Sequence, residues 1–172
     1  MLDYNHSYYV TIDEGVLTLP DHSFHGISKE HNWSFKTKDS APASTDTLIV
    51  DATGQGDFNT VQGALDFIPD FSQKQTVILI QAGDYEELVY ARNKTNVKIK
   101  GAGMERTRVH YANNEVFNPH PLTVKTNEWP GTFPSRRAAF MLDNCSDIQL
   151  EDLTIATDLH GQAEGLLLNG ER

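Results

Sequence analysis

The chain has 172 residues, 38% hydrophobic and 22% charged, and no apolar run approaches the length of a membrane-spanning helix. Its formal net charge of −10, without clusters of lysine or arginine, argues against a nucleic-acid partner. The single cysteine, Cys145, excludes an intrachain disulfide, and His22, His25 and His31 lack the spacing of a zinc site, so we expect no metal and no other cofactor.

The first 37 residues contain two stretches with the composition of β-strands. They are Tyr8-Tyr9-Val10-Thr11-Ile12 and Trp33-Ser34-Phe35-Lys36-Thr37. Two or three strands cannot form a stable sheet core alone, so we expect residues 1–37 to be the end of a larger β-domain. Small, polar and proline residues over 38–46 indicate a linker.

Residues 47–172 read as a β-rich domain with one helix. After a turn over 51–57, Asn59 or Thr60 is predicted to cap a helix whose apolar face is formed by Val61, Ala64, Leu65 and Ile68 and which Pro69 ends. Short strands without helices between them exclude a doubly wound α/β fold and favour a sandwich, barrel or solenoid. The predicted strands cover 47–50, 76–80, 97–100, 122–124, 138–142, 148–150, 153–155 and 165–168.

A weak internal repeat bears on this choice. Residues 96–101 and 146–152 each place a polar turn before a strand that alternates apolar and polar residues. Short strands with Asn or Asp at the corners are typical of a parallel β-helix, in which each coil buries aliphatic side chains against the next.

The two predicted strands before the linker resemble the closing strands of bacterial Ig-like modules. The resemblance covers residues 4–37 and is carried by the patterns Tyr-x-Val-Thr-Ile and Trp-Ser-Phe-x-Thr. It implies that the protein is secreted or held at the cell surface, although the residues after Met1 do not resemble a signal peptide. Any other β-sandwich could contribute a similar pair of strands.

Four motifs after the linker occur in the order and spacing of one enzyme family. They are a Gly-x-Gly-Asp-Phe-x-Thr-Val-Gln turn at 54–62, Gly-x-Tyr-x-Glu at 83–87, a Gly-rich turn at 101–103 and a Gln-Ala segment at 161–168. Together they resemble the pectin methylesterases. The resemblance implies an all-β, right-handed parallel β-helix of the pectin lyase-like type, with an N-terminal capping helix and truncated at its C-terminal side. It also implies hydrolysis of methyl esters of polygalacturonate, the substrate being pectin or a related polysaccharide.

The resemblance implies one catalytic residue within this chain, Gln162. Its side-chain amide can donate to the negative charge that develops on the ester carbonyl oxygen. The Asp nucleophile, the second Asp and the Arg of the family are expected downstream of the Gln-Ala segment, so residues 1–172 alone should be inactive. The alternative is that Gln162 is an exposed turn residue without a catalytic role.

Other conspicuous residues have structural explanations beside functional ones. We expect Tyr85 and Glu87 to be structural, the ring packing and the carboxylate accepting hydrogen bonds. Trp129 or Phe133, in an irregular segment over 111–135, could stack on a sugar or pack on the solenoid. Arg136 and Arg137 could contact a galacturonate carboxylate but are as readily solvated.

Two other functions stay open at this point. A non-catalytic β-helix that binds glycans or forms a surface stalk would lack the downstream Asp pair, and a polysaccharide lyase would instead need a basic residue and calcium ligands in later coils.

Overall fold

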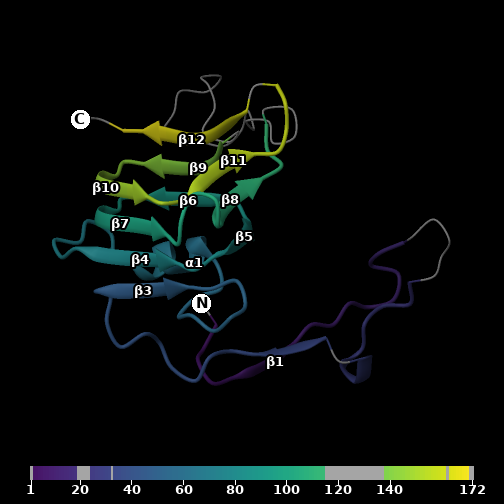
Figure 1. Cartoon of the computed structure of the whole chain (residues 1–172). Coiled ribbons are helices and arrows are strands. Elements are labelled where there is room, and N and C mark those ends of the chain that lie inside the picture. The colour runs from purple at the N-terminus through teal and green to yellow at the C-terminus, as the bar shows by residue number, and fades with distance from the viewer. Residues whose placement is uncertain (1, 19–23, 32, 115–137, 162, 171–172) are drawn as a thin grey trace. The chain divides into compact units, whose positions relative to one another are not determined.

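The computed structural model describes residues 2–18, 24–31, 33–114, 138–161 and 163–170. The chain divides into two compact units, Met1–Pro42 and Ala43–Arg172 (Figure 1).

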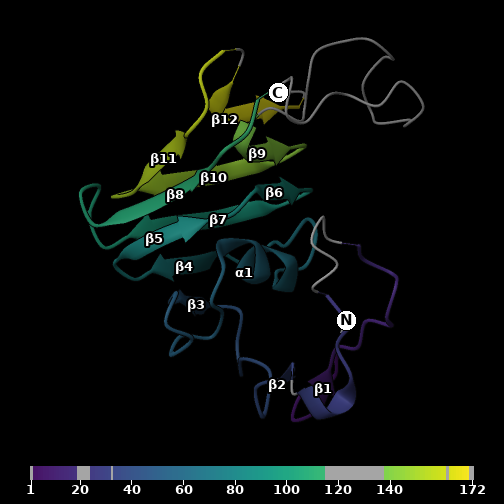
Figure 2. The ribbon, with the colours of Figure 1, turned by 90° about the vertical axis from the view of Figure 1, so that its right-hand side faces the viewer.

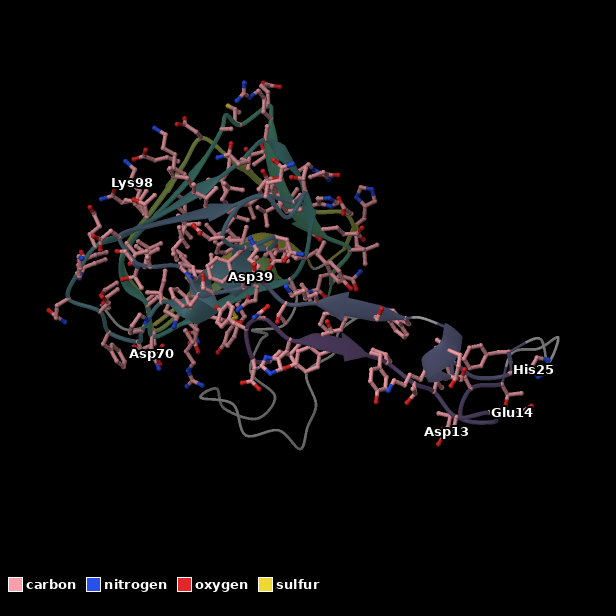
Figure 3. The ribbon with its side chains drawn as sticks, turned by 90° about the horizontal axis from the view of Figure 1, so that it is seen from below. Asp13, Glu14, His25, Asp39, Asp70 and Lys98 are labelled. Carbon is pink, nitrogen blue, oxygen red and sulfur yellow. The ribbon has the colours of Figure 1, made fainter. Side chains whose placement is uncertain are left out.

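The smaller unit contains one antiparallel strand pair, β1 (Ser7–Tyr9) and β2 (Ser34–Lys36). Tyr8 lies opposite Phe35, and their rings stack with centroids 5.6 Å apart. A 3-10 turn, η1 (Lys29–His31), precedes β2. In the segment between the strands, an exposed ion pair joins Glu14 and His25, both labelled in Figure 3. Both strands expected here are present in shortened form.

The larger unit is built from parallel strands in three sheets, and their orders are β3-β4-β7-β10, β5-β8-β11 and β6-β9-β12. The first sheet contains β3 (Thr47–Val50), β4 (Thr76–Ile80), β7 (Thr95–Gly101) and β10 (Ser146–Glu151). The second contains β5 (Gly83–Glu86), β8 (Thr107–Tyr111) and β11 (Thr154–Thr157). The third contains β6 (Val89–Arg92), β9 (Ala138–Asp143) and β12 (Glu164–Asn169).

Successive strands occupy the three sheets in turn, so the chain winds as a β-helix. The coils are β4-β5-β6, β7-β8-β9 and β10-β11-β12, stacked one above another in Figures 1 and 2. Seen from below in Figure 3, the backbone follows a closed outline, with Lys98 and Asp70 at its periphery.

Aliphatic side chains at matched positions fill the interior of the solenoid. In the first sheet Leu48, Ile78, Ile99 and Leu150 are consecutive register partners, and the first three are fully buried. This column links successive coils through burial of apolar surface. The repeat found in the sequence is thereby confirmed, since Val97 in one copy pairs with Ile148 in the other.

Left-handed residues form the corners between β6 and β7 and between β9 and β10. Asn93 and Asn144, at the corners, have φ near +59° and +52°, and Asn96 and Asp147, the second residues of β7 and β10, repeat the pattern at +57° and +53°. Asn and Asp adopt this conformation more readily than other non-glycine residues. Asn144 Nδ2 also donates to Asn93 Oδ1 at 2.7 Å, which joins the two corners.

The helix α1 (Val61–Phe67) packs against β3 and β6 and completes the core near the first coil. Val61, Ala64, Leu65 and Ile68 are buried, as their spacing predicts. Thr60 is the N-cap and accepts from the Gly63 amide at 3.1 Å, and the chain is extended from Ile68 before Pro69. The structure thus confirms the predicted N-cap, the apolar face of the helix and its end before Pro69.

Candidate functional site

The candidate site is the β11–β12 connection, residues 158–163, because it contains Gln162. Gln162 itself lies outside the described residues, whereas Asp158, Leu159, His160, Gly161 and Ala163 are described. Gly161 has φ of +107°, a conformation that favours glycine. The contacts of these flanking residues define how the connection is held.

Backbone and side-chain hydrogen bonds continue the pairing of β8 and β11 beyond their ends. The Asp158 amide donates to the Tyr111 carbonyl at 3.1 Å. Thr157 Oγ1 donates to the Asn113 carbonyl at 2.8 Å, and Asn114 Nδ2 donates to the His160 carbonyl at 3.2 Å. Residues 113–114 therefore run beside the connection and fix its first half.

Asn113 anchors this segment in the body of the solenoid. It is 1% exposed, and its Nδ2 donates to the Ala138 carbonyl at the start of β9 at 3.0 Å. A buried amide held in this way resists displacement, because breaking its hydrogen bond would leave buried polar groups without partners.

An ion-pair cluster lies on the outward face of the second sheet and reaches the connection. Asp158 Oδ2 is 2.5 Å from His110 Nδ1, and Arg108 Nη2 donates to Asp158 Oδ1 at 2.5 Å. On the other side of the ring, His110 Nε2 is 3.0 Å from Asp84 Oδ1, an electrostatic contact without the alignment of a hydrogen bond. We call Arg108, His110 and Asp158 the clamp.

Electrostatics in the clamp favour an ionised Asp158. The hydrogen bond from His110 is the largest influence that lowers the pKa of Asp158; Arg108 adds to it, and desolvation opposes it. His110 is the most protected member, since its side chain is 10% exposed, compared with 31% for Asp158 and 43% for Arg108.

Within the residues that the structure describes, no group of three or more His, Cys, Asp and Glu side chains is placed to hold a metal ion. The cluster is held by charge-assisted hydrogen bonds instead.

The Gly-x-Tyr-x-Glu motif is structural here, as expected. The Tyr85 ring is buried against Gly83, where a Cβ atom would lie 3.2 Å from the ring. Glu87 accepts from the Val61 and Gln62 amides at 2.8 and 2.9 Å, which satisfies the first amides of α1. Burial raises the pKa of Glu87, and these two hydrogen bonds oppose the shift.

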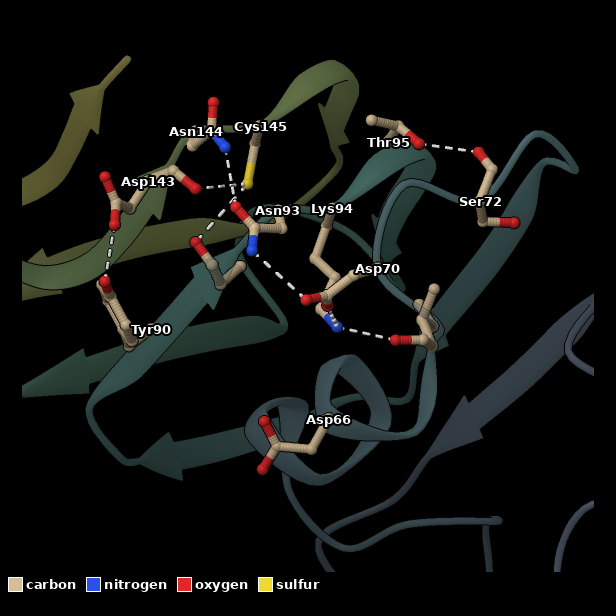
Figure 4. A network of polar contacts seen from close by, with 12 residues as sticks. Asp66, Asp70, Ser72, Tyr90, Asn93, Lys94, Thr95, Asp143, Asn144 and Cys145 are labelled. Atoms are coloured by element: carbon tan, nitrogen blue, oxygen red, sulfur yellow. Dashed lines mark hydrogen bonds and ion pairs between the residues drawn. The ribbon is translucent and has the colours of Figure 1, made fainter.

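A further polar network ties the other end of α1 to the coil corners (Figure 4). Lys94 Nζ donates to the Ile68 carbonyl at 2.6 Å and to Asp70 at 2.7 Å. The Lys94 bond lowers the pKa of Asp70. Asn93 joins Asp70 on one side and Asn144 on the other. These contacts stabilise the solenoid and lie apart in sequence from the Gln162 connection.

Several residues considered from sequence lie outside the described part of the chain. These are Trp129, Phe133, Arg136 and Arg137, together with the strand predicted over 122–124. The sequence interpretation also passed over Arg108, His110 and Asp158. The signal that could have found the first two is the alternation in Thr107-Arg108-Val109-His110, which places both polar side chains on one face.

Comparison with known sequences decides the family. The sequence model described as Pectinesterase matches residues 47–150, more than half of the chain. The chain belongs to the pectinesterase family. It is 28% identical to Probable pectinesterase 8 of Arabidopsis thaliana over 138 residues, which are 78% of this chain and 34% of that protein. It is also 37% identical to a Pectinesterase/pectinesterase inhibitor of Ficus pumila var. awkeotsang over 70 residues, 40% of this chain and 13% of that protein.

Solved structures of pectin methylesterases share the fold. A pectin methylesterase from carrot aligns with TM-score 0.58 and 23% identity over 77% of this chain and 38% of its own. A pectin methylesterase mutant in complex with hexasaccharide IV aligns with TM-score 0.51 and 19% identity, over 74% of this chain and 40% of its own. The fold is thus the right-handed parallel β-helix expected from the motifs. The chain spans about a third of the length of the first curated relative above.

None of the helices described here has the length and apolar character needed to cross a bilayer.

Proposed function

We propose that the protein containing this chain hydrolyses methyl esters of polygalacturonate and so modifies cell-wall pectin. The observation that carries the proposal is the pectinesterase match over residues 47–150, on a chain whose strands form the corresponding solenoid. A solved relative bound to a hexasaccharide supports a polysaccharide as the partner.

Gln162 is the proposed catalytic residue of this segment. Ester hydrolysis passes through a tetrahedral intermediate whose oxygen carries negative charge, and a neutral amide donor stabilises that charge without ionising. A donor cannot replace a nucleophile, so the reaction also needs the Asp pair and the Arg expected downstream. This segment then supplies the framework and one oxyanion donor.

Product analysis with the full-length protein tests the proposal. Methylated pectin should yield methanol and free carboxylates while the polysaccharide backbone stays intact. Unsaturated chain ends would indicate a lyase, and binding without any product would indicate a glycan-binding or stalk protein. Either of the last two results would overturn the proposal.

We also propose a location and a role for the segment before the solenoid. Residues 1–37 would be the C-terminal strands of a bacterial Ig-like module, joined by a linker over 38–46 to the domain of residues 47–172. The antiparallel pair of β1 and β2 supports this assignment, and so does the division of the chain at Pro42. Such a module fits a secreted or surface-held enzyme. Secretion of the full-length protein to the medium or cell surface would be the corresponding observation.

A further inference from the structure

We propose that the clamp of Arg108, His110 and Asp158 positions the β11–β12 connection for ester hydrolysis. The three side chains would be positioning residues, acting through the backbone that leads to Gln162. This inference rests on the proposed function, because it assumes that Gln162 donates to the oxyanion.

The clamp acts where the sheet stops supporting the chain. Among the described residues, the last backbone hydrogen bond between the extensions of β8 and β11 is the one from the Asp158 amide to Tyr111. Asp158 is therefore the final residue of the connection that is held by the sheet, four positions before Gln162. A side chain that fixes Asp158 fixes the direction in which the connection leaves the sheet.

Two donors from one strand hold both oxygens of Asp158. Arg108 and His110 are two positions apart on β8, so their side chains share the outward face. Arg108 donates to Asp158 Oδ1 and His110 Nδ1 contacts Asp158 Oδ2, each at 2.5 Å. A carboxylate bonded through both oxygens cannot rotate freely, and charge-assisted bonds of this kind are stronger than neutral ones.

The neighbouring coil holds the histidine ring from its other side. Asp84 on β5 faces His110 Nε2 at 3.0 Å and lies 3.6 Å from Arg108 Nη1. Glu86, also on β5, is the register partner of His110. The His110 ring thus lies between the carboxylates of Asp158 and Asp84, which belong to different coils. Side chains from β5 and β8 therefore hold the connection where it leaves β11.

The Asn114 side chain provides the second point of support. Its bond to the His160 carbonyl lies two residues beyond Asp158 and two before Gln162. Two fixed points on a short segment restrict its path far more than one. Catalytic donors must be held within about 0.5 Å of the productive geometry, and a displacement of about 1 Å can cost about 100-fold in rate.

The test compares Asp158→Asn with Glu151→Gln in the full-length protein. Glu151 pairs with Lys98 and Lys100 on the first sheet, so the control also breaks ion pairs of the solenoid but at another sheet. Asp158→Asn should lower kcat by roughly 10-fold to 100-fold with KM changed less than about 3-fold. Hydrogen exchange of the amides in 158–164 should accelerate. Glu151→Gln should change neither kcat nor this exchange.

A double variant separates positioning from general stability. If the clamp acts through Gln162, adding Asp158→Asn to Gln162→Ala should lower kcat by less than about 2-fold more, because the donor is already missing. Equal effects of Asp158→Asn with and without Gln162 would overturn the proposal. A wild-type protein without esterase activity would overturn the proposed function instead. In that case hydrogen exchange would still test whether the clamp holds the connection. Unchanged exchange of the amides in 158–164 in Asp158→Asn would show that it does not, and would overturn the proposal.

Discussion

At the scale of single residues, the chain separates groups that hold the fold from the one group proposed to act on substrate. Glu87 and Lys94 carry charges, yet both bind backbone atoms of α1 and its end. Asp158 is engaged by two side chains. Only Gln162 is assigned to the reacting ester, and its role is the most direct to test by substitution.

Replacing Gln162 should affect catalysis rather than binding. In the full-length protein Gln162→Ala should lower kcat by about 100-fold or more with little change in KM, because the donor is matched to charge that appears only during reaction. Gln162→Glu should be as slow or slower, since a carboxylate cannot donate and repels the oxyanion. Gln149→Ala, at an exposed glutamine on β10, is the control. The measurement is steady-state kinetics on methylated pectin. If kcat of either Gln162 variant stays within a factor of about three of the wild-type value, Gln162 has no catalytic role.

The lowered pKa of Asp158 predicts a pH-dependent contribution to stability. A carboxyl whose pKa is lower in the folded state stabilises it above the unfolded pKa of about 3.9, and this contribution is lost as the pH falls through the folded value. Wild type should therefore resist urea better than Asp158→Asn at pH 7, and the difference should shrink as the pH falls below about 4. Glu105→Gln, at an exposed glutamate, should show no comparable difference. If wild type and Asp158→Asn differ in urea resistance by the same amount at pH 7 and below about pH 4, the lowered pKa of Asp158 does not contribute to stability.

At the scale of elements, α1 is too short to be stable alone and depends on side chains from later coils. Isolated helices shorter than about 12 residues are marginal in water, and α1 has 7 residues. Glu87 satisfies its first amides and Lys94 satisfies the carbonyl at its end. The helix is thus fixed by the coil that contains β6 and the corner that follows it.

Removal of the Glu87 carboxylate should loosen the start of α1. Glu87→Ala leaves two amides without their acceptor and should lower the free energy of unfolding by about 1–2 kcal/mol. Glu87→Gln keeps one acceptor oxygen, so its free energy of unfolding should lie between those of wild type and Glu87→Ala. Urea unfolding measures the change, with Glu105→Ala as the control at an exposed glutamate. Equal stabilities of wild type and Glu87→Ala would show that the cap contributes nothing.

Removal of the Lys94 ammonium should loosen the other end. Lys94→Met keeps an unbranched side chain but deletes the bond to the Ile68 carbonyl, at a cost of about 1–3 kcal/mol for a hydrogen bond from a charged group. Lys74→Met breaks an exposed pair with Asp46 and should cost less than about 1 kcal/mol. If Lys94→Met and Lys74→Met unfold at the same urea concentration, the buried hydrogen bond of Lys94 stabilises the fold no more than an exposed ion pair does.

Much of the element pattern was predictable, and the omissions have a common cause. The strands at 47–50 and 76–80 and the face of α1 carry continuous or regularly spaced aliphatic residues. The strands β5, β6 and β8 were missed, because each offers only one or two inward side chains, as Tyr85 does in β5. So short an alternation is easily hidden by polar residues on the outward face.

The clamp could not be predicted for a different reason. Asp158 meets Arg108 and His110 because β8 and β11 lie in successive coils, 46 residues apart at their paired starts, Arg108 and Thr154. That separation depends on the length of the segment between β8 and β9, which no local pattern specifies. Gln162 was identified through family resemblance, whereas its surroundings follow from the stacking of coils.

At the scale of the whole molecule, we propose that this chain is one part of a longer catalytic solenoid. The column from Leu48 through Ile78 and Ile99 to Leu150 joins the coils into one body. The body includes Asp158 and Gly161, which precede Gln162 in the chain, and the aligned part is 34% of the length of Probable pectinesterase 8. Under the proposed function, this chain contributes the framework and Gln162 as one donor, while a nucleophile is expected elsewhere in the protein.

Methanol release from methylated pectin shows whether the chain needs catalytic residues from the rest of the protein. The full-length protein and residues 1–172 alone should be assayed side by side at equal concentration. We expect methanol from the full-length protein and none above background from residues 1–172, since an oxyanion donor without a nucleophile cannot cleave the ester. Methanol released by residues 1–172 at a rate near that of the full-length protein would contradict it.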